Sequence, residues 1–214
     1  MSFSKRKKTY IWATWLAAAL SGEKACEFSS WLKGNFTYTK VDENKDLSKW
    51  KADHARMVRD RVEKLRSEGW VVTVEGENKF TVRGKVADVG GQADIVAVRG
   101  DEIVVEDCKT GKKKDEHFWQ VVIYMALLPK VDSRFMAAKR IRGTVIYPDD
   151  ATRDVDGYEA EGETNRIFER IKELATAAEP PKTPSASECR FCDIADCDAR
   201  LSDDSSSTTD TEAF

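Results

Sequence analysis

Hydrophobic residues change their spacing along the chain, and this change separates helical from strand segments. From Leu47 or Ser48 to about Ser67, apolar residues recur at three- and four-residue spacing, and Gly69 follows as a typical helix-end signal. From Trp70 onward, short β-branched runs alternate with glycines, which is typical of strands joined by turns. The spacing therefore predicts one long amphipathic helix followed by a sheet.

The other expected elements follow from the same two periods. Strands are expected at Trp70–Val74, Lys79–Val86, Ala93–Val98, Ile103–Lys109 and Arg142–Tyr147, with a possible edge strand at Gly157–Ala160. Helices are expected at Tyr10–Ala19, Glu23–Lys33, Asp115–Leu128 and Thr164–Ala178, and residues 34–46 are expected to form a loop. This order predicts an α/β fold in which helices flank a mixed sheet.

The composition is that of a globular protein, with 41% hydrophobic and 34% charged residues among 214. We expect one domain at residues 1–200 and a disordered acidic tail at 201–214. The chain contains no run of 18 apolar residues, so we expect no membrane span and a cytoplasmic location.

The net charge of −3 does not exclude a nucleic-acid partner, because the tail accounts for it. Without the tail's four acidic residues, the chain has 35 basic and 34 acidic residues. Lys112, Lys113 and Lys114 form a local basic run that could contact DNA, although such a run is also typical of a solvated face.

Candidate catalytic residues gather around an expected hairpin. Asp94 opens its first strand, and strand alternation places Asp107 and Lys109 on one face of the second strand. Gln120 and Tyr124 lie four residues apart on the next expected helix. Carboxylate oxygens with water suit Mg²⁺ or Mn²⁺, and a nearby lysine could orient an attacking water or hold a phosphate oxygen. The alternative is a surface hairpin with solvated charges.

Alternation also separates two residues that neighbour this motif. Glu106 and Cys108 fall on the face opposite Lys109, so we expect Asp107, and not Glu106, to be the functional acid. Cys108 is expected to be a small buried hydrophobic residue.

The ordered set Asp94, Asp107-Cys108-Lys109-Thr110-Gly111 and Gln120-x-x-x-Tyr124 resembles the RecB-like branch of the PD-(D/E)xK nucleases. The resemblance implies a restriction-endonuclease-like core at about residues 47–148 and metal-dependent hydrolysis of DNA. It implies that Asp94 and Asp107 bind the metal and that Gln120 and Tyr124 contact the DNA backbone or position Lys109. Action as an exonuclease on single-stranded DNA comes from the resemblance alone.

The two histidines receive different interpretations. The resemblance implies that His54, on the long helix, joins the metal site, while a helix-surface position is the alternative. His117 could face phosphate, but we expect it to be solvated. Trp119 could stack on a base or pack against the sheet, and Tyr124 could simply belong to the core.

Four cysteines form a second constellation: Cys26, Cys189, Cys192 and Cys197. In a cytoplasmic chain, the close spacing of the last three favours a metal over disulfides, and Cys26 could supply a fourth ligand. Thiolates alone fit either zinc or an iron–sulfur cluster.

The same cysteine pattern resembles the iron–sulfur RecB-like nucleases, which include CRISPR-adaptation exonucleases and AddB-type helicase–nuclease subunits. This resemblance implies a [4Fe–4S] cluster that joins residues 10–35 to residues 180–200. Structural Zn²⁺ and free thiols are the alternatives.

Two other functions fit the same residues. One is a non-catalytic module that binds DNA or scaffolds a complex, and the other is a subunit active only in a larger assembly, such as a CRISPR-adaptation complex. The sequence has no G-x-x-x-x-G-K-[ST] motif, so this chain brings no P-loop motor.

Overall fold

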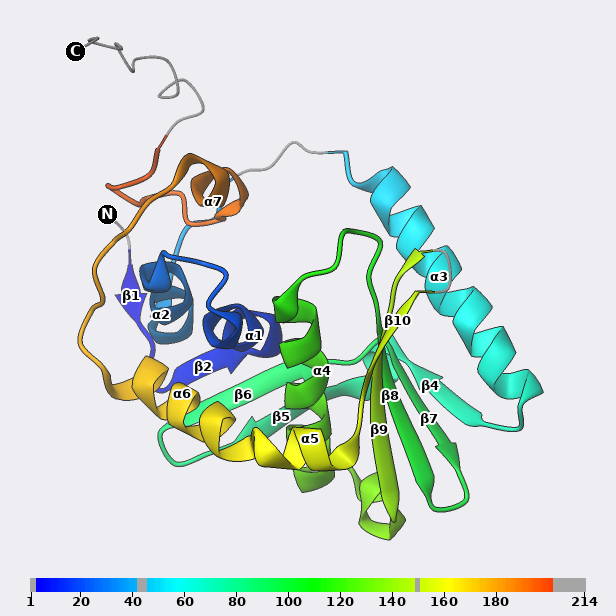
Figure 1. Cartoon of the computed structure of the whole chain (residues 1–214). Coiled ribbons are helices and arrows are strands. Elements are labelled where there is room, and N and C mark those ends of the chain that lie inside the picture. The colour runs from blue at the N-terminus through cyan, green and yellow to red at the C-terminus, as the bar shows by residue number, and fades with distance from the viewer. Residues whose placement is uncertain (1–2, 42–45, 149–150, 202–214) are drawn as a thin grey trace, which may run out of the picture.

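A mixed sheet of five strands, in the order β10-β9-β8-β7-β4, lies at the centre of the computed structural model (Figure 1). The structure describes residues 3–41, 46–148 and 151–201. The strands are β4 (Val71–Val74), β7 (Ile95–Arg99), β8 (Glu102–Cys108), β9 (Arg140–Ile146) and β10 (Thr152–Val155). β8 pairs antiparallel with β7 and parallel with β9, so the sheet is mixed as the sequence predicts.

Helices cover both faces of this sheet. On one face lies α3 (Ser48–Ser67), which packs Val58, Val62 and Leu65 against the sheet. On the other face lies α4 (Asp115–Leu127), which connects β8 to β9 and is buried along most of its length. β8 is covered on both faces and is buried from Ile103 to Cys108, so its two acidic residues, Glu106 and Asp107, are buried together with its apolar ones. The predicted α/β architecture is therefore confirmed.

A second sheet was only partly predicted. Its order is β2-β6-β5, with β2 at Thr9–Trp12, β5 at Lys79–Arg83 and β6 at Ala87–Gln92. The expected helix at Tyr10–Ala19 is wrong for its first three residues, because Tyr10–Trp12 pair in parallel with the glycine-rich β6. A side chain at Gly90 would overlap the Tyr10 ring, so this close approach requires glycine.

Most of the remaining elements come from the segments that precede and follow the central sheet in sequence, and these segments pack against each other. Among the described residues, the remaining elements are α1 (Ala13–Ser21), α2 (Glu27–Asn35), α5 (Gly157–Gly162), α6 (Thr164–Thr176), α7 (Ala186–Phe191), the short pair β1 (Ser4–Lys5) and β3 (Phe36–Thr37), and 3₁₀ turns at Glu75–Asn78, Leu128–Lys130 and Ser133–Ala137. Asn35 Nδ2 donates a hydrogen bond of 2.8 Å to the carbonyl of Leu174, which ties α2 to α6. In Figure 1, α1 and α2 lie between α7 and strand β2 of the second sheet.

Two smaller expectations are wrong. Gly157–Ala160 lies in helix α5, because Asp156 accepts a hydrogen bond from the backbone of Glu159 and caps a helix there. The edge strand is β10 instead. The expected loop at 34–46 contains the end of α2 and strand β3, while residues 42–45 and most of the expected tail at 201–214 lie outside the described residues. Within the described ranges, no helix is both long and apolar enough to cross a membrane.

Candidate active site

The ends of β7 and β8 bring the two predicted carboxylates to one edge of the central sheet. Asp94 immediately precedes β7, and its Oδ2 accepts a hydrogen bond of 2.7 Å from the backbone N–H of Cys108. The same oxygen lies 3.2 Å from Nε2 of His54, which projects from α3. Asp94 therefore holds the end of the neighbouring strand and the histidine together.

Helix α4 completes this edge through a hydrogen-bond network. Gln120 Nε2 donates to Asp107 Oδ1 at 2.9 Å and to the Tyr124 hydroxyl at 2.7 Å. Its Oε1 accepts from Lys109 Nζ at 3.0 Å. The Tyr124 hydroxyl in turn donates to the carbonyl of Gln92 at 2.8 Å. Gln120 thus fixes Asp107 and Lys109 relative to each other, and Tyr124 fixes Gln120.

Asp107 and Lys109 form a desolvated ion pair. Lys109 Nζ lies 2.5 Å from Asp107 Oδ2, and the Asp107 side chain is only 1% exposed. Burial raises the pKa of Asp107 to about 6, with a contribution from the charge of Asp94, although the charge of Lys109 opposes the rise. Burial by itself lowers the pKa of Lys109, but the two carboxylates outweigh it and the net pKa is raised. Lys109 is therefore a cation at neutral pH, suited to stabilising negative charge.

The opposite face of β8 has a separate partner. Glu106 is fully buried and accepts two hydrogen bonds from Arg61 of α3, at 2.6 and 2.5 Å. Cys108 is also buried, in the apolar cluster beneath α3. Both residues lie where strand alternation places them, away from Lys109.

A cleft of about 370 Å³ opens beside these residues. Lys112 and Lys114 line it, whereas Lys113 is absent from its lining and lies 5.5 Å over the ring of Tyr147. Two of the three predicted DNA-contacting lysines are therefore at the cleft. Trp50 also lines it, a residue that the sequence analysis did not single out although it precedes His54 by one helical turn.

Two side chains of α4 are more buried than a solvated interpretation allows. His117 is 8% exposed, with Nδ1 3.2 Å from the Tyr147 hydroxyl, so the expectation that it is solvated is wrong. Burial, aided by the positive charge of Lys109, lowers the pKa of His117 to about 4. Trp119 is 5% exposed and packs under the guanidinium of Arg166, which agrees with the packing alternative.

The model of the PD-(D/E)XK nuclease superfamily matches residues 13–197, which span the network described above. The chain belongs to this superfamily. Its structure is also similar to that of SSO0001, with 17% sequence identity, coverage of 93% of this chain and 91% of that chain, and a TM-score of 0.49. An alkaline exonuclease, LHK-Exo from Laribacter hongkongensis, is similar at 14% identity, with coverage of 77% and 89% and a TM-score of 0.39.

PD-(D/E)XK nucleases use divalent metals, and the donor set of this nuclease chain fits such an ion. Among the described residues, no three His, Cys, Asp or Glu side chains are grouped so that they could hold a metal. Mg²⁺, however, usually takes only one or two protein carboxylates and keeps several waters. Asp94 and Asp107 could supply those carboxylates, and a bound dication would offset the cost of ionising the buried Asp107.

The four predicted cluster cysteines line a second cavity of the nuclease chain, with a volume of about 660 Å³. Cys26 comes from the start of α2, and the other three come from α7 and the segment after it. Phe28, Leu32 and Ile194 pack against this region. Both ends of the chain thus contribute cysteines to one cavity, although their side chains do not form a metal-binding group in the described part of the chain.

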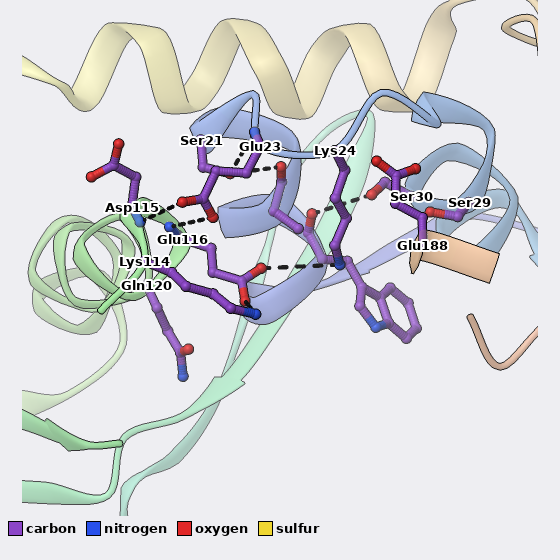
Figure 2. Close-up of polar contacts among 12 residues, drawn as sticks. Ser21, Glu23, Lys24, Ser29, Ser30, Lys114, Asp115, Glu116, Gln120 and Glu188 are labelled. Carbon is purple, nitrogen blue, oxygen red and sulfur yellow. Dashed lines mark hydrogen bonds and ion pairs between the residues drawn. The ribbon is translucent and has the colours of Figure 1, made fainter. Parts of the chain in front are cut away.

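A short segment links this cysteine region to helix α4 (Figure 2). Glu188 of α7 accepts hydrogen bonds from the backbone N–H groups of Ala25 and Cys26, at 2.8 and 3.1 Å. Two residues earlier, the Glu23 carboxylate accepts from the backbone N–H groups of Asp115 and Glu116, at 2.8 and 3.4 Å. These N–H groups belong to the first turn of α4, where backbone donors have no acceptor within the helix and a negative charge is stabilising. The segment therefore anchors the N-terminus of the helix that carries Gln120.

Proposed function

We propose that the protein is a metal-dependent deoxyribonuclease that hydrolyses phosphodiester bonds. The observation that carries this proposal is the buried network in which Gln120 holds Asp107 and Lys109 together beside Asp94, at the edge of a cleft. A surface hairpin with solvated charges would not bury an aspartate almost completely at the wall of a cleft. Membership of the nuclease superfamily supports the same reaction.

Each residue has a role that follows from its contacts. Asp94 and Asp107 would bind one or two Mg²⁺ or Mn²⁺ ions, with His54 assisting through Asp94. When bound, the metal activates a water and neutralises charge on the phosphate. Lys109, a cation already held in place, stabilises the negative charge that develops as water attacks phosphorus and the P–O bond to the leaving group breaks. Gln120, which Tyr124 holds in turn, fixes the positions of Lys109 and Asp107 relative to each other.

Single-stranded DNA is the proposed substrate, and removal of nucleotides from an end is the proposed mode. Local charge supports a DNA substrate, because Lys112 and Lys114 line the cleft and can pair with phosphates although the chain as a whole is acidic. The single-strand and exonuclease parts of the proposal come from the resemblance of the sequence motifs. Lys113 lies over Tyr147 and does not line the cleft, so we expect it to contribute less to DNA binding than Lys112 and Lys114 do.

We also propose that Cys26, Cys189, Cys192 and Cys197 bind a [4Fe–4S] cluster, with Zn²⁺ as the alternative metal. The support is that all four line one cavity although Cys26 is distant from the others in the chain. Protein purified without oxygen should contain iron and acid-labile sulfide, or zinc in their place. Protein that lacks all three when prepared both with and without oxygen would contradict a metal site.

The decisive test of the nuclease is cleavage of end-labelled single- and double-stranded DNA with Mn²⁺, Mg²⁺ or EDTA. Wild type should cut only with metal, and the product ladder gives the polarity. Lys109→Ala should abolish cleavage, while the matched control Lys113→Ala, which removes a lysine outside the cleft, should retain most of it. If pure wild-type protein cuts neither substrate, the isolated chain is not a nuclease. The alternative is then a subunit that binds DNA without cutting it or that is active only in a larger complex, such as a CRISPR-adaptation complex.

A further inference from the structure

Trp50 is a large aromatic side chain left open at the wall of the catalytic cleft. It is 52% exposed, although an indole normally buries most of its surface. Its ring stacks on the ring of His54, with centroids 5.5 Å apart and an interplanar angle of 20°. His54 is in turn held by Asp94. The indole therefore contacts a side chain that is itself hydrogen-bonded within the proposed metal site.

The surroundings of Trp50 favour a nucleic-acid ligand over a structural role. The lining of the cleft combines this aromatic surface with the cations Lys112 and Lys114. Aromatic surfaces beside phosphate-binding cations are how proteins bind unpaired nucleotides, since every base has a face that can stack. Tyr158 is even more exposed, at 88%, but it lies on α5 and does not line this cleft, so exposure alone does not mark such a position.

We propose that Trp50 is a stacking site for one unpaired nucleobase of the DNA strand whose phosphate enters the catalytic cleft. This inference rests on the proposed nuclease function and adds a reason for single-strand preference. A base within a duplex is already stacked on its neighbours, whereas an unpaired base can move onto the indole. The stack on His54 restricts the indole before DNA arrives, which lowers the ordering cost of binding.

The test measures DNA binding separately from cleavage. Anisotropy of a labelled single-stranded oligonucleotide is followed in EDTA, where no metal-dependent cleavage can occur. Trp50→Ala should weaken binding by about tenfold, in the range of one lost aromatic–base stack. Trp50→Leu, which keeps an apolar side chain against His54, should be weakened almost as much, whereas Trp50→Phe should retain part of the affinity. Tyr158→Ala is the matched control and should bind like wild type.

Abasic oligonucleotides identify the contact. Removing one base at the stacking position should weaken binding to wild type about as much as Trp50→Ala does, and should have little further effect on that variant. In cleavage assays with Mn²⁺, Trp50→Leu should raise KM more than it lowers kcat, which a general loss of fold would not do.

The outcomes separate this inference from the nuclease itself. If wild type binds and cuts single strands, and Trp50→Ala and Trp50→Leu bind them as tightly as wild type does, the stacking site is refuted and the nuclease proposal stands. Additive effects of Trp50→Ala and every abasic position also refute the stacking site. If wild type neither binds nor cuts DNA, both proposals fall together.

Discussion

Glu106 and Asp107 are adjacent acidic residues on opposite faces of β8. Substituting each of them separately tests which of the two is needed for cleavage. Glu106 is fully buried with two hydrogen bonds to Arg61, and Asp107 is held by Gln120 and Lys109 at the cleft. We predict that Glu106→Ala destabilises the fold but leaves the folded protein active, whereas Asp107→Asn abolishes cleavage by folded protein.

The size of the first effect follows from burial. Removing one partner of a buried ion pair costs about 3–5 kcal/mol, because the other charge is left without compensation. Arg61 is 22% exposed and can turn toward water, so the cost should lie at the lower end, about 3 kcal/mol. For a domain of this size, that corresponds to a melting temperature lower by about 6 to 12 °C.

The assay combines thermal unfolding with initial cleavage rates in Mn²⁺, at a temperature where every variant is folded. Glu106→Gln keeps the side-chain shape and one acceptor, so it should lose less stability than Glu106→Ala. The double variant Arg61→Met/Glu106→Leu should recover much of the loss, because it removes both buried charges together. Folded Glu106→Gln protein without activity, or Glu106→Ala melting like wild type, would refute this assignment of faces.

Three further predictions test other parts of the molecule. Glu23→Ala should lower the free energy of unfolding by about 1 kcal/mol and reduce kcat, because two N–H donors of α4 lose their acceptor. Glu23→Gln keeps one acceptor oxygen and should retain part of kcat. An unchanged kcat in Glu23→Ala would argue against this anchor. Cys197→Ala should lower the melting temperature before it affects cleavage, and normal melting with no activity would contradict a structural role for the cysteine region. The unfolded protein binds more protons at His117 than the folded one between pH 6.5 and about 4, so stability should fall as the pH drops through this window. Urea midpoints at several pH values should show a weaker fall for His117→Gln, and equal pH dependence in both proteins would exclude this origin.

Much of the catalytic edge could be predicted because it depends on local backbone geometry. Alternation along one strand places Asp107 and Lys109 together and Glu106 on the other face, and the structure has this arrangement. Helical spacing places Gln120 beside Tyr124, and a hydrogen bond joins them. The convergence of these pieces with Asp94 follows from a hairpin whose two strands were both recognisable. The catalytic roles of these residues stay predictions until they are tested.

Pairing between distant segments could not be predicted in the same way. Tyr10–Trp12 is apolar and directly precedes helix α1, so its sequence also fits the start of that helix. Its extended conformation depends on pairing with β6. Strand β6 was not predicted because Gly90 and Gly91 are poor strand formers. Their lack of a side chain allows the rings of Tyr10 and Phe80 to lie close to the backbone of β6. His117 was misjudged because its helix packs against α1 as well as the sheet, which leaves little of that helix exposed.

The contacts between the two flanking parts of the chain have a consequence for the order of folding. Strand β2 needs β6, Asn35 bonds to α6, and Ala25 and Cys26 bond to Glu188 of α7. The segment that holds β2 and α2 therefore completes its packing only when α6 and α7 are also in place, and contacts so far apart in sequence form slowly. Because Glu23 belongs to the same part of the chain, helix α4 gains its anchor late. A folding chain can thus form the central sheet early, while the N-terminus of the helix that carries Gln120 still lacks its acceptor, so the network around Asp107 becomes fixed late in folding.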